Sequence, residues 1–332
     1  MISFVPATSS WPFSIGNLIR SFFLGGFLLS AMACVAQDIK PDAYSGLRWR
    51  FLGTHRAGRV TAVVGIPGQP NLYYAGTPNG GVWKSDDAGR TWKPIFDAVH
   101  VASIGAIAVA PSNANIIYVA TGEQGKGRGV FKSSDAGATW SSAGMVEEHF
   151  ISSIIVDPTN PDVVIAGAFG SAVPSEPRGL FKTTDGGKSW TKTLTDADGA
   201  TGVADISAAP ENPQILYAAL NPPPGEPGER DLAGESRIYI SADEGTSWKQ
   251  SGTEGLPAKA RGRIGLAVIP GTSGRGVFAI MNQGLYRSND GGATWLQATK
   301  DPRIEGSWYF SRVFVDPNHP QVVYVMQTCT YR

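Results

Sequence analysis

Short apolar runs, broken by turn residues, follow one another along most of this chain. Each run holds two apolar segments of strand length around a turn rich in Pro, Asn, Asp or Gly, which is typical of two antiparallel strands joined by a tight hairpin. The six runs cover residues 61–77, 105–122, 153–168, 203–220, 265–281 and 311–327. Few long stretches have the spacing of an amphipathic helix. The pattern therefore predicts an all-β chain built on six strand pairs.

A third short apolar segment and then an eight-residue phrase follow each of the first five strand pairs. The phrase has the form [ST]-x-D-x-G-x-[ST]-W. Its copies are SDDAGRTW (85–92), SSDAGATW (133–140), TTDGGKSW (183–190), SADEGTSW (241–248) and SNDGGATW (288–295). Successive aspartates are 47 to 58 residues apart. A fixed period of this length with four short strands per unit predicts the blades of a β-propeller.

The chemistry of the phrase is that of a tight turn. Its aspartate can accept hydrogen bonds from backbone N–H groups of the loop, and its glycine supplies a positive φ. The tryptophan then begins an outer strand and packs between neighbouring blades. We therefore expect structural roles, and neither acid catalysis nor metal binding, for the five aspartates: Asp87, Asp135, Asp185, Asp243 and Asp290.

The two ends of the repeat region each resemble part of a blade. Thr330-Tyr331-Arg332 matches Leu285-Tyr286-Arg287, which precedes the fifth phrase, and Trp49 has the position of a sixth repeat tryptophan. We expect six four-stranded blades in which residues 47–51 pair beside residues 329–332, because this closure removes two exposed sheet edges. The alternative is that the chain is part of a larger propeller.

The first 36 residues have a different pattern. Arg20 precedes an apolar run, Phe22 to Ala36, that ends in small residues. This predicts a signal peptide over residues 1–36, a linker over 37–46 and a propeller over 47–332, with secretion or export to the periplasm and no membrane span. Lipid attachment at Cys34 is the less favoured alternative. The one other cysteine is Cys329, so no disulfide is expected once the leader is removed.

Charge and composition exclude several classes of function. Lys and Arg number 28, as do Asp and Glu, so nothing points to nucleic acid. The four histidines have no zinc-ligand spacing, and the repeat phrases lack the closing Glu of a calcium loop. We expect no metal and no cofactor, and the sequence does not indicate an oligomeric state.

Candidate ligand-binding residues come from the loops on the propeller face opposite the repeat phrases. Arginine forks suit a carboxylate or sulfate, and an indole suits a sugar ring. The candidates are Arg56, Arg59, Glu123, Glu148, His149, Arg263 and Trp308. A glycosidase would need two facing carboxyl groups, for which Glu123, Glu147, Glu148 and Glu305 are available. The alternative is that these are unrelated solvated loop residues.

The phrases resemble the Asp-box, or BNR, repeat of sialidase-like propellers. Residues 49–97 are similar to the opening of large secreted bacterial proteins named as BNR-repeat glycosyl hydrolases or sortilin-type propellers, and the similarity covers residues 47–332. The resemblance implies a propeller with a carbohydrate or peptide ligand.

Residue-by-residue comparison argues against catalysis. Xyloglucan-degrading endoglucanases of this type carry a catalytic Asp in a T-D-x-G-G-x-[YW] phrase, where this chain has Pro78. Sialidases carry an early [FY]-R-I-P phrase, and Thr54 to Val60 lacks its Ile-Pro. The favoured function is therefore a glycan- or peptide-binding module without catalysis, and the alternative is a sialidase-like or xyloglucanase-like glycoside hydrolase or the N-terminal part of one. A third interpretation is an assembly factor resembling the photosystem II assembly propeller.

Overall fold

The computed structural model describes residues 58–332, except 124–125, 149, 171–176, 196–200, 223–234, 261, 305–310 and 328. The chain divides into two units, Met1–Ala57 and Gly58–Arg332, and only the second is described below. The predicted signal peptide, linker and strand over residues 47–51 lie outside the described residues.

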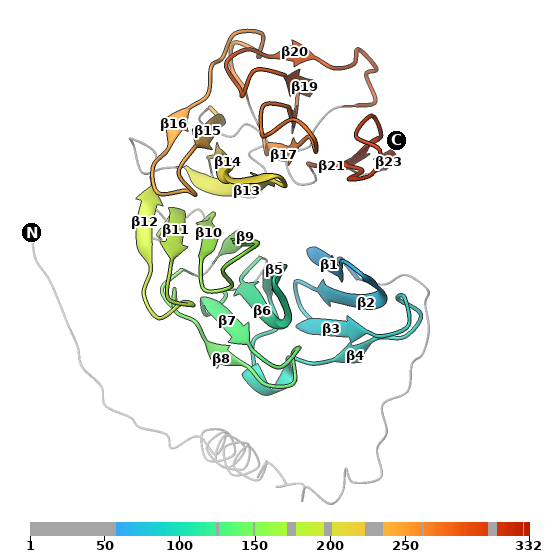
Figure 1. The fold of residues 1–332 in the computed structure, drawn as a ribbon, viewed down its shortest axis with the longest axis vertical. Helices are drawn as coiled ribbons and strands as arrows, with labels where there is room; N and C mark the ends of the chain where they lie inside the picture. The colour runs from blue at the N-terminus through green and yellow to red at the C-terminus, as the bar shows by residue number, and fades with distance from the viewer. Residues whose placement is uncertain are drawn as a thin grey trace, which may run out of the picture. The chain divides into compact units, whose positions relative to one another are not determined.

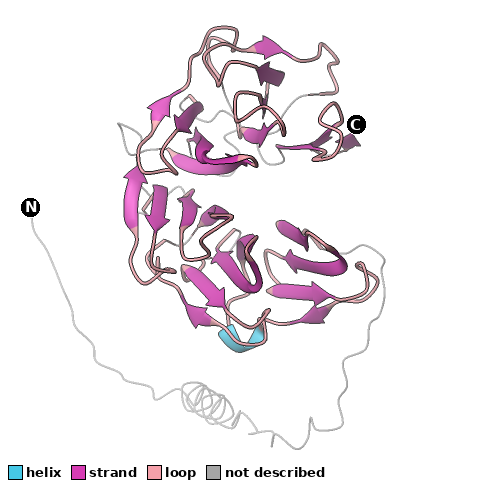
Figure 2. Ribbon diagram, in the orientation of Figure 1, coloured by secondary structure: helices cyan, strands magenta, loops and turns pink. Residues whose placement is uncertain are grey.

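The described unit is built from six antiparallel sheets, numbered 1 to 6 along the chain (Figures 1 and 2). Sheet 1 holds β1 (Ala62–Ile66), β2 (Gln69–Gly76), β3 (Val82–Ser85) and β4 (Lys93–Pro94). Sheet 2 holds β5 (Ile104–Ala110), β6 (Asn113–Thr121), β7 (Val130–Ser133) and β8 (Ser141–Ser142). Sheet 3 holds β9 (Ile151–Val156), β10 (Val164–Ala168), β11 (Gly179–Thr183) and β12 (Thr191–Leu194).

The last three sheets repeat this order. Sheet 4 holds β13 (Gly202–Ala209), β14 (Asn212–Asn221), β15 (Arg237–Ser241) and β16 (Lys249–Gln250). Sheet 5 holds β17 (Gly265–Val268), β18 (Val277–Met281), β19 (Gly284–Ser288) and β20 (Leu296–Gln297). Sheet 6 has three strands among the described residues, β21 (Arg312–Val315), β22 (Val323–Met326) and β23 (Thr330–Tyr331). A short 3₁₀ turn, η2 (Asp97–Val99), follows β4.

The sheets are arranged in a ring, and from sheet 1 to sheet 6 the first strand of each sheet packs beside the first strand of the next (Figure 1). This is the arrangement of a six-bladed β-propeller, so the fold predicted from the repeats is confirmed. The fourth strand predicted for sheet 6, residues 47–51, lies outside the described residues and stays a prediction.

The core lies between consecutive sheets. Tyr74, Tyr118 and Tyr217 are fully buried there, and each hydroxyl donates to a backbone carbonyl of the following sheet. The inner strands approach each other so closely that only glycine fits at some positions. A Cβ on Gly105 would lie 1.9 Å from the backbone oxygen of Ile151 in the next sheet. Glycine on the inner strands near the axis therefore has a steric cause.

The five repeat phrases form five nearly identical loops between the third and fourth strands, hereafter the repeat loops. In the first, the Asp87 carboxylate accepts the Thr91 N–H at 2.8 Å and the Thr91 hydroxyl at 2.6 Å. The Ser85 hydroxyl donates to Asp87 at 2.9 Å and accepts the Gly89 N–H at 2.8 Å. The corresponding bonds recur around Asp135, Asp185, Asp243 and Asp290.

Four of the repeat tryptophans join their sheet to the preceding one. In each case the indole N–H donates to the residue three places after the preceding repeat tryptophan. The pairs are Trp140 with Ile95, Trp190 with Ala143, Trp248 with Thr193 and Trp295 with Ser251. Trp92 differs, because its N–H bonds Gly89 of its own loop and its side chain is 37% exposed, against 1% for Trp295.

Candidate functional site

Six residues, one from each sheet or its adjoining loop, make up a charged group at the end of the sheets opposite the repeat loops, hereafter the axial cluster. They lie near the start of the first strand or the end of the second, which the antiparallel register brings together. The members are Arg59, Glu123, Phe169, Asp205, Arg263 and Arg312. Two ion pairs and one ring contact link them, and the charges of Glu123, Asp205 and Arg312 act on Arg263.

Arg59 and Glu123 form the first pair of the cluster. Arg59 precedes β1 and Glu123 follows β6, and their side chains meet with Nη2 and Oε2 3.1 Å apart. The Glu123 backbone N–H donates to the Ser103 hydroxyl at 2.9 Å, which fixes the loop. Burial raises the pKa of the Glu123 carboxyl, and the positive charges of Arg59 and Arg263 oppose that rise.

Asp205 and Arg312 form the second pair. Both lie on first strands, β13 and β21, and Arg312 Nη1 lies 2.5 Å from Asp205 Oδ1. The other Asp205 oxygen accepts the Leu266 N–H at 2.9 Å. Asp205 is buried, and each of its two carboxylate oxygens has a partner within the fold.

Arg263 has no such ion pair among the described residues. Its Nη2 donates to the Ala204 carbonyl at 3.3 Å, and its guanidinium lies 5.7 Å from the centre of the Phe169 ring. Burial first, and then the nearby positive charge of Arg312, lower its pKa to about 10. The half-buried guanidinium therefore remains charged near neutral pH.

The chemistry of the axial cluster favours an anion. Three guanidinium groups face two carboxylates, which leaves one positive charge in excess. A guanidinium carries five N–H donors, and the single carbonyl contact of Arg263 uses one of them. The remaining donors suit the fork-like recognition of a carboxylate.

The structure brings together three of the seven candidate residues from the sequence: Arg59, Glu123 and Arg263. Glu148 lies in the turn after β8, where its backbone N–H donates to the Met145 carbonyl at 3.2 Å. The other three candidates, Arg56, His149 and Trp308, lie outside the described residues.

Sequence reasoning missed Phe169, Asp205 and Arg312. For the two charged residues a signal was present, because Asp205 lies within a mostly apolar first strand (VADISAA) and Arg312 begins another (RVFV). A charge at that position of an inner strand indicates a partner near the axis, since an unpaired charge there would be costly.

Two further features bear on metal binding and on catalysis. Within the described ranges, no group of three or more His, Cys, Asp or Glu side chains could hold a metal ion, and no helix is long and apolar enough to cross a bilayer. Pro78 is buried in the turn between β2 and β3, where the Thr77 N–H bonds the Gly81 carbonyl at 3.0 Å. No carboxylate occupies that position.

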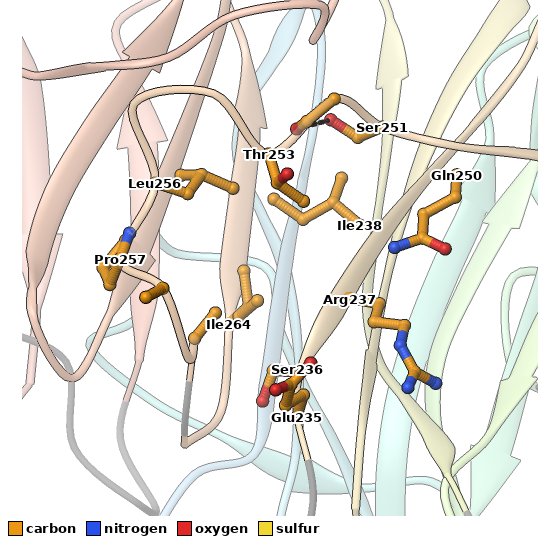
Figure 3. Close-up of a pocket in the computed structure, with 13 residues that line it drawn as sticks. Glu235, Ser236, Arg237, Ile238, Gln250, Ser251, Thr253, Leu256, Pro257 and Ile264 are labelled. Carbon is orange, nitrogen blue, oxygen red and sulfur yellow. Dashed lines mark hydrogen bonds between the residues drawn. The ribbon is translucent and has the colours of Figure 1, made fainter.

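A cavity of about 260 Å³ lies apart from the axial cluster, between sheets 4 and 5 (Figure 3). Its walls come from the start of β15, from Gln250 of β16 and from the segment over residues 251–260 that leads toward β17. Figure 3 shows Ile238, Leu256 and Ile264 close together, with Gln250 along the opposite edge.

Comparison with known proteins gives one family match. The Sortilin-Vps10 family, described as sortilin, neurotensin receptor 3, matches residues 80–221. No curated protein sequence matches the chain.

Solved structures with a similar fold include three GH74 enzymes. An ancestral GH74 enzyme superposes with a TM-score of 0.63 at 22% identity, over 81% of this chain and 34% of that one. The Niastella koreensis GH74 enzyme gives 0.62 at 19% identity, over 80% and 43%. The GH74 xyloglucanase from Xanthomonas campestris gives 0.54 at 18% identity, over 84% and 52%.

The chain thus covers 34 to 52% of the length of these enzymes, and at such identities the likeness concerns the fold alone. The six sheets and these folds identify the chain as a β-propeller, and residues 80–221 are similar to the sortilin family.

Proposed function

We propose that this protein is an exported propeller that binds a ligand bearing a carboxylate, on a glycan or a peptide, at the axial cluster and without catalysis. The observation that carries the proposal is Arg263, a half-buried guanidinium whose one hydrogen bond among the described residues goes to a backbone carbonyl.

The physical argument rests on the cost of withdrawing a charge from water. A buried ion is stabilised when a partner of opposite sign and further hydrogen bonds replace its hydration. The nearest carboxylates already serve Arg59 and Arg312. An incoming carboxylate can accept two parallel N–H bonds from Arg263 and balance the excess charge of the cluster.

The same contacts argue against hydrolysis. A glycosidase requires one carboxyl as acid and a second as base or nucleophile. Both Asp205 oxygens are bonded within the fold, and Pro78 stands where xyloglucan-degrading relatives carry their acid. The cluster therefore lacks a second carboxylate that is available to a substrate.

Calorimetric titration of the protein with sodium glucuronate, and with glucuronamide as the uncharged control, tests the proposal. We expect saturable binding of glucuronate alone, weakened roughly 10- to 100-fold in Arg263→Gln, since hydrogen bonds to charged groups contribute about 1.5–3 kcal/mol. Arg287→Gln is the matched control, because Arg287 also stacks on a phenylalanine, Phe278, but lies exposed on β19 outside the cluster. Equal binding of the amide would contradict the proposal.

One observation favours the alternative of a glycoside hydrolase. Burial raises the pKa of Glu123, which is the direction needed in a general acid. Release of reducing sugar from xyloglucan, or of nitrophenol from aryl glycosides, together with its loss in Glu123→Gln, would support hydrolysis over binding.

Export rests on the sequence of the first 36 residues. We infer cleavage after Ala36 and release to the periplasm or the medium, with lipid attachment at Cys34 as the second alternative. Mass spectrometry of the mature protein distinguishes them: a chain that begins at Gln37 supports release, whereas one that begins at a lipid-modified Cys34 supports anchoring.

A further inference from the structure

The cavity between sheets 4 and 5 has an aliphatic floor. Ile238 on β15 and Ile264 before β17 are buried, and Leu256 and Pro257 of the connecting segment close one side. No aromatic ring is among the residues that line it. Such a floor favours an aliphatic group over a sugar ring, which binds best on an aromatic face.

Backbone contacts hold the walls of the cavity in place. Ser236 N–H donates to the Ala260 carbonyl at 2.9 Å, and Ser251 N–H donates to the Ile238 carbonyl at 2.8 Å. The connecting segment is also tied to sheet 5, because Trp295 N–H donates to the Glu254 carbonyl at 2.9 Å. The cavity is therefore preformed, and little ordering is needed when a ligand enters.

The polar side chains that line the cavity include the charged Glu235 and Arg237 and two kinds of neutral group. The hydroxyls of Ser236 and Ser251 donate to the carbonyls of Gly262 and Gly292, each at 2.7 Å, and so serve the fold. The side chains of Gln250 and Thr253 are exposed at the rim and make no hydrogen bond to any other described residue. An amide that both donates and accepts, beside a hydroxyl, suits the N–H and C=O groups of a peptide.

We propose that this cavity is a second binding site, which takes one aliphatic side chain of an extended peptide. Gln250 and Thr253 hydrogen-bond the peptide backbone on either side of that residue. The volume of about 260 Å³ lies just below the range of drug-sized pockets, which fits a single leucine-sized group. The inference goes beyond the proposed function, because it requires no carboxylate and none of the axial residues.

The test uses uncharged tripeptides, so that the axial cluster makes no contribution. Acetyl-glycyl-leucyl-glycinamide is titrated into the protein and followed by NMR, with acetyl-glycyl-glycyl-glycinamide as the reference. We expect saturable shifts for backbone amides over residues 236–264 with the leucyl peptide. The triglycine peptide should bind at least roughly 10-fold more weakly, the value of burying one leucine side chain.

Variants then assign the contacts. Gln250→Ala and Thr253→Val should each weaken the leucyl peptide about 5-fold, with unchanged circular dichroism, since a neutral hydrogen bond is worth about this much. Gln297→Ala is the matched control, because Gln297 on β20 pairs with Tyr286 in the same way as Gln250 on β16 pairs with Tyr239. Arg263→Gln should leave tripeptide binding unchanged, which separates failure here from failure at the axial cluster.

Three results would overturn the inference: equal binding of the triglycine peptide, equal losses in Gln250→Ala and Gln297→Ala, or shifts outside residues 236–264. Preferential binding of cellobiose at the same amides would also overturn it and would assign the cavity to a glycan.

Discussion

The two ends of the sheets are organised in opposite ways. At one end, the five repeat loops make the same set of bonds five times, always between residues at most four positions apart. At the other end, the axial cluster draws a different residue from each sheet, and its pairs join positions 59 to 107 residues apart. The repeated end closes each sheet, whereas the varied end is where we propose that a ligand binds.

Acid should have the largest effect on the repeated end. Hydroxyl and backbone N–H donors, Thr91 and Thr139 first among them, hold the pKa values of Asp87 and Asp135 at about 2, and the same loop geometry around Asp243 gives about 2. These values lie below the unfolded value of about 3.9, so their stabilisation is complete above about pH 4 and is lost as pH falls toward 2. Thermal melts from pH 6 to pH 2 should show a steep fall over that window. A melting temperature that does not change with pH would show that the loop carboxylates do not stabilise the ring.

Trp295→Ala should give the largest effect of a single substitution. The side chain is 1% exposed and joins sheet 5 to sheet 4, and truncation of such a buried ring costs about 3–5 kcal/mol. Urea unfolding measures the loss. Trp92→Ala is the control, since the exposed Trp92 bonds only its own loop among the residues that the structure describes. A loss of equal size in Trp92→Ala would contradict the role given to the bond between sheets.

Asp205→Asn should have a smaller effect on stability and a clear effect on the varied end. It leaves Arg312 without its carboxylate, which costs about 1–3 kcal/mol once solvent screening of the partly exposed Arg312 is included. The same change raises the positive charge of the cluster by one, so glucuronate should bind more tightly. Weaker glucuronate binding in a folded variant would show that the positive charge of the axial cluster does not drive anion binding.

Asp135→Asn should have the smallest effect. Asparagine keeps one acceptor for the Thr139 N–H but weakens it, so the melting temperature should fall slightly. Glucuronate affinity should not change, because the loop lies at the far end of the sheet. A loss of affinity without a change in melting temperature would give the repeat loops a direct role in binding.

The repeated end could be predicted from the sequence because its chemistry is local. The spacing of Asp87, Gly89 and Trp92 within one phrase is enough to specify a loop, and the recurrence of the phrase is enough to specify a ring of sheets. The neighbours of Arg263 in the axial cluster could not be predicted in this way. Phe169, Asp205 and Arg312 reach it from three other sheets, and their meeting depends on strand register, which composition does not show.

The cavity carried no signal in the sequence either. It arises from the path of residues 251–260, which connect sheets 4 and 5 and lie outside the repeated phrase. The proposed closure by residues 47–51 stays a prediction.

The indole contacts between sheets have a consequence for how the ring comes apart. Each of Trp140, Trp190, Trp248 and Trp295 couples its sheet to the one before it, so neighbouring sheets should open as a series of linked steps rather than independently. The rate of hydrogen exchange at each indole N–H reports how often the contact at that position opens. Exchange with deuterium should be fastest at Trp92 and slowest at Trp295, and the order of the others should reveal where opening begins.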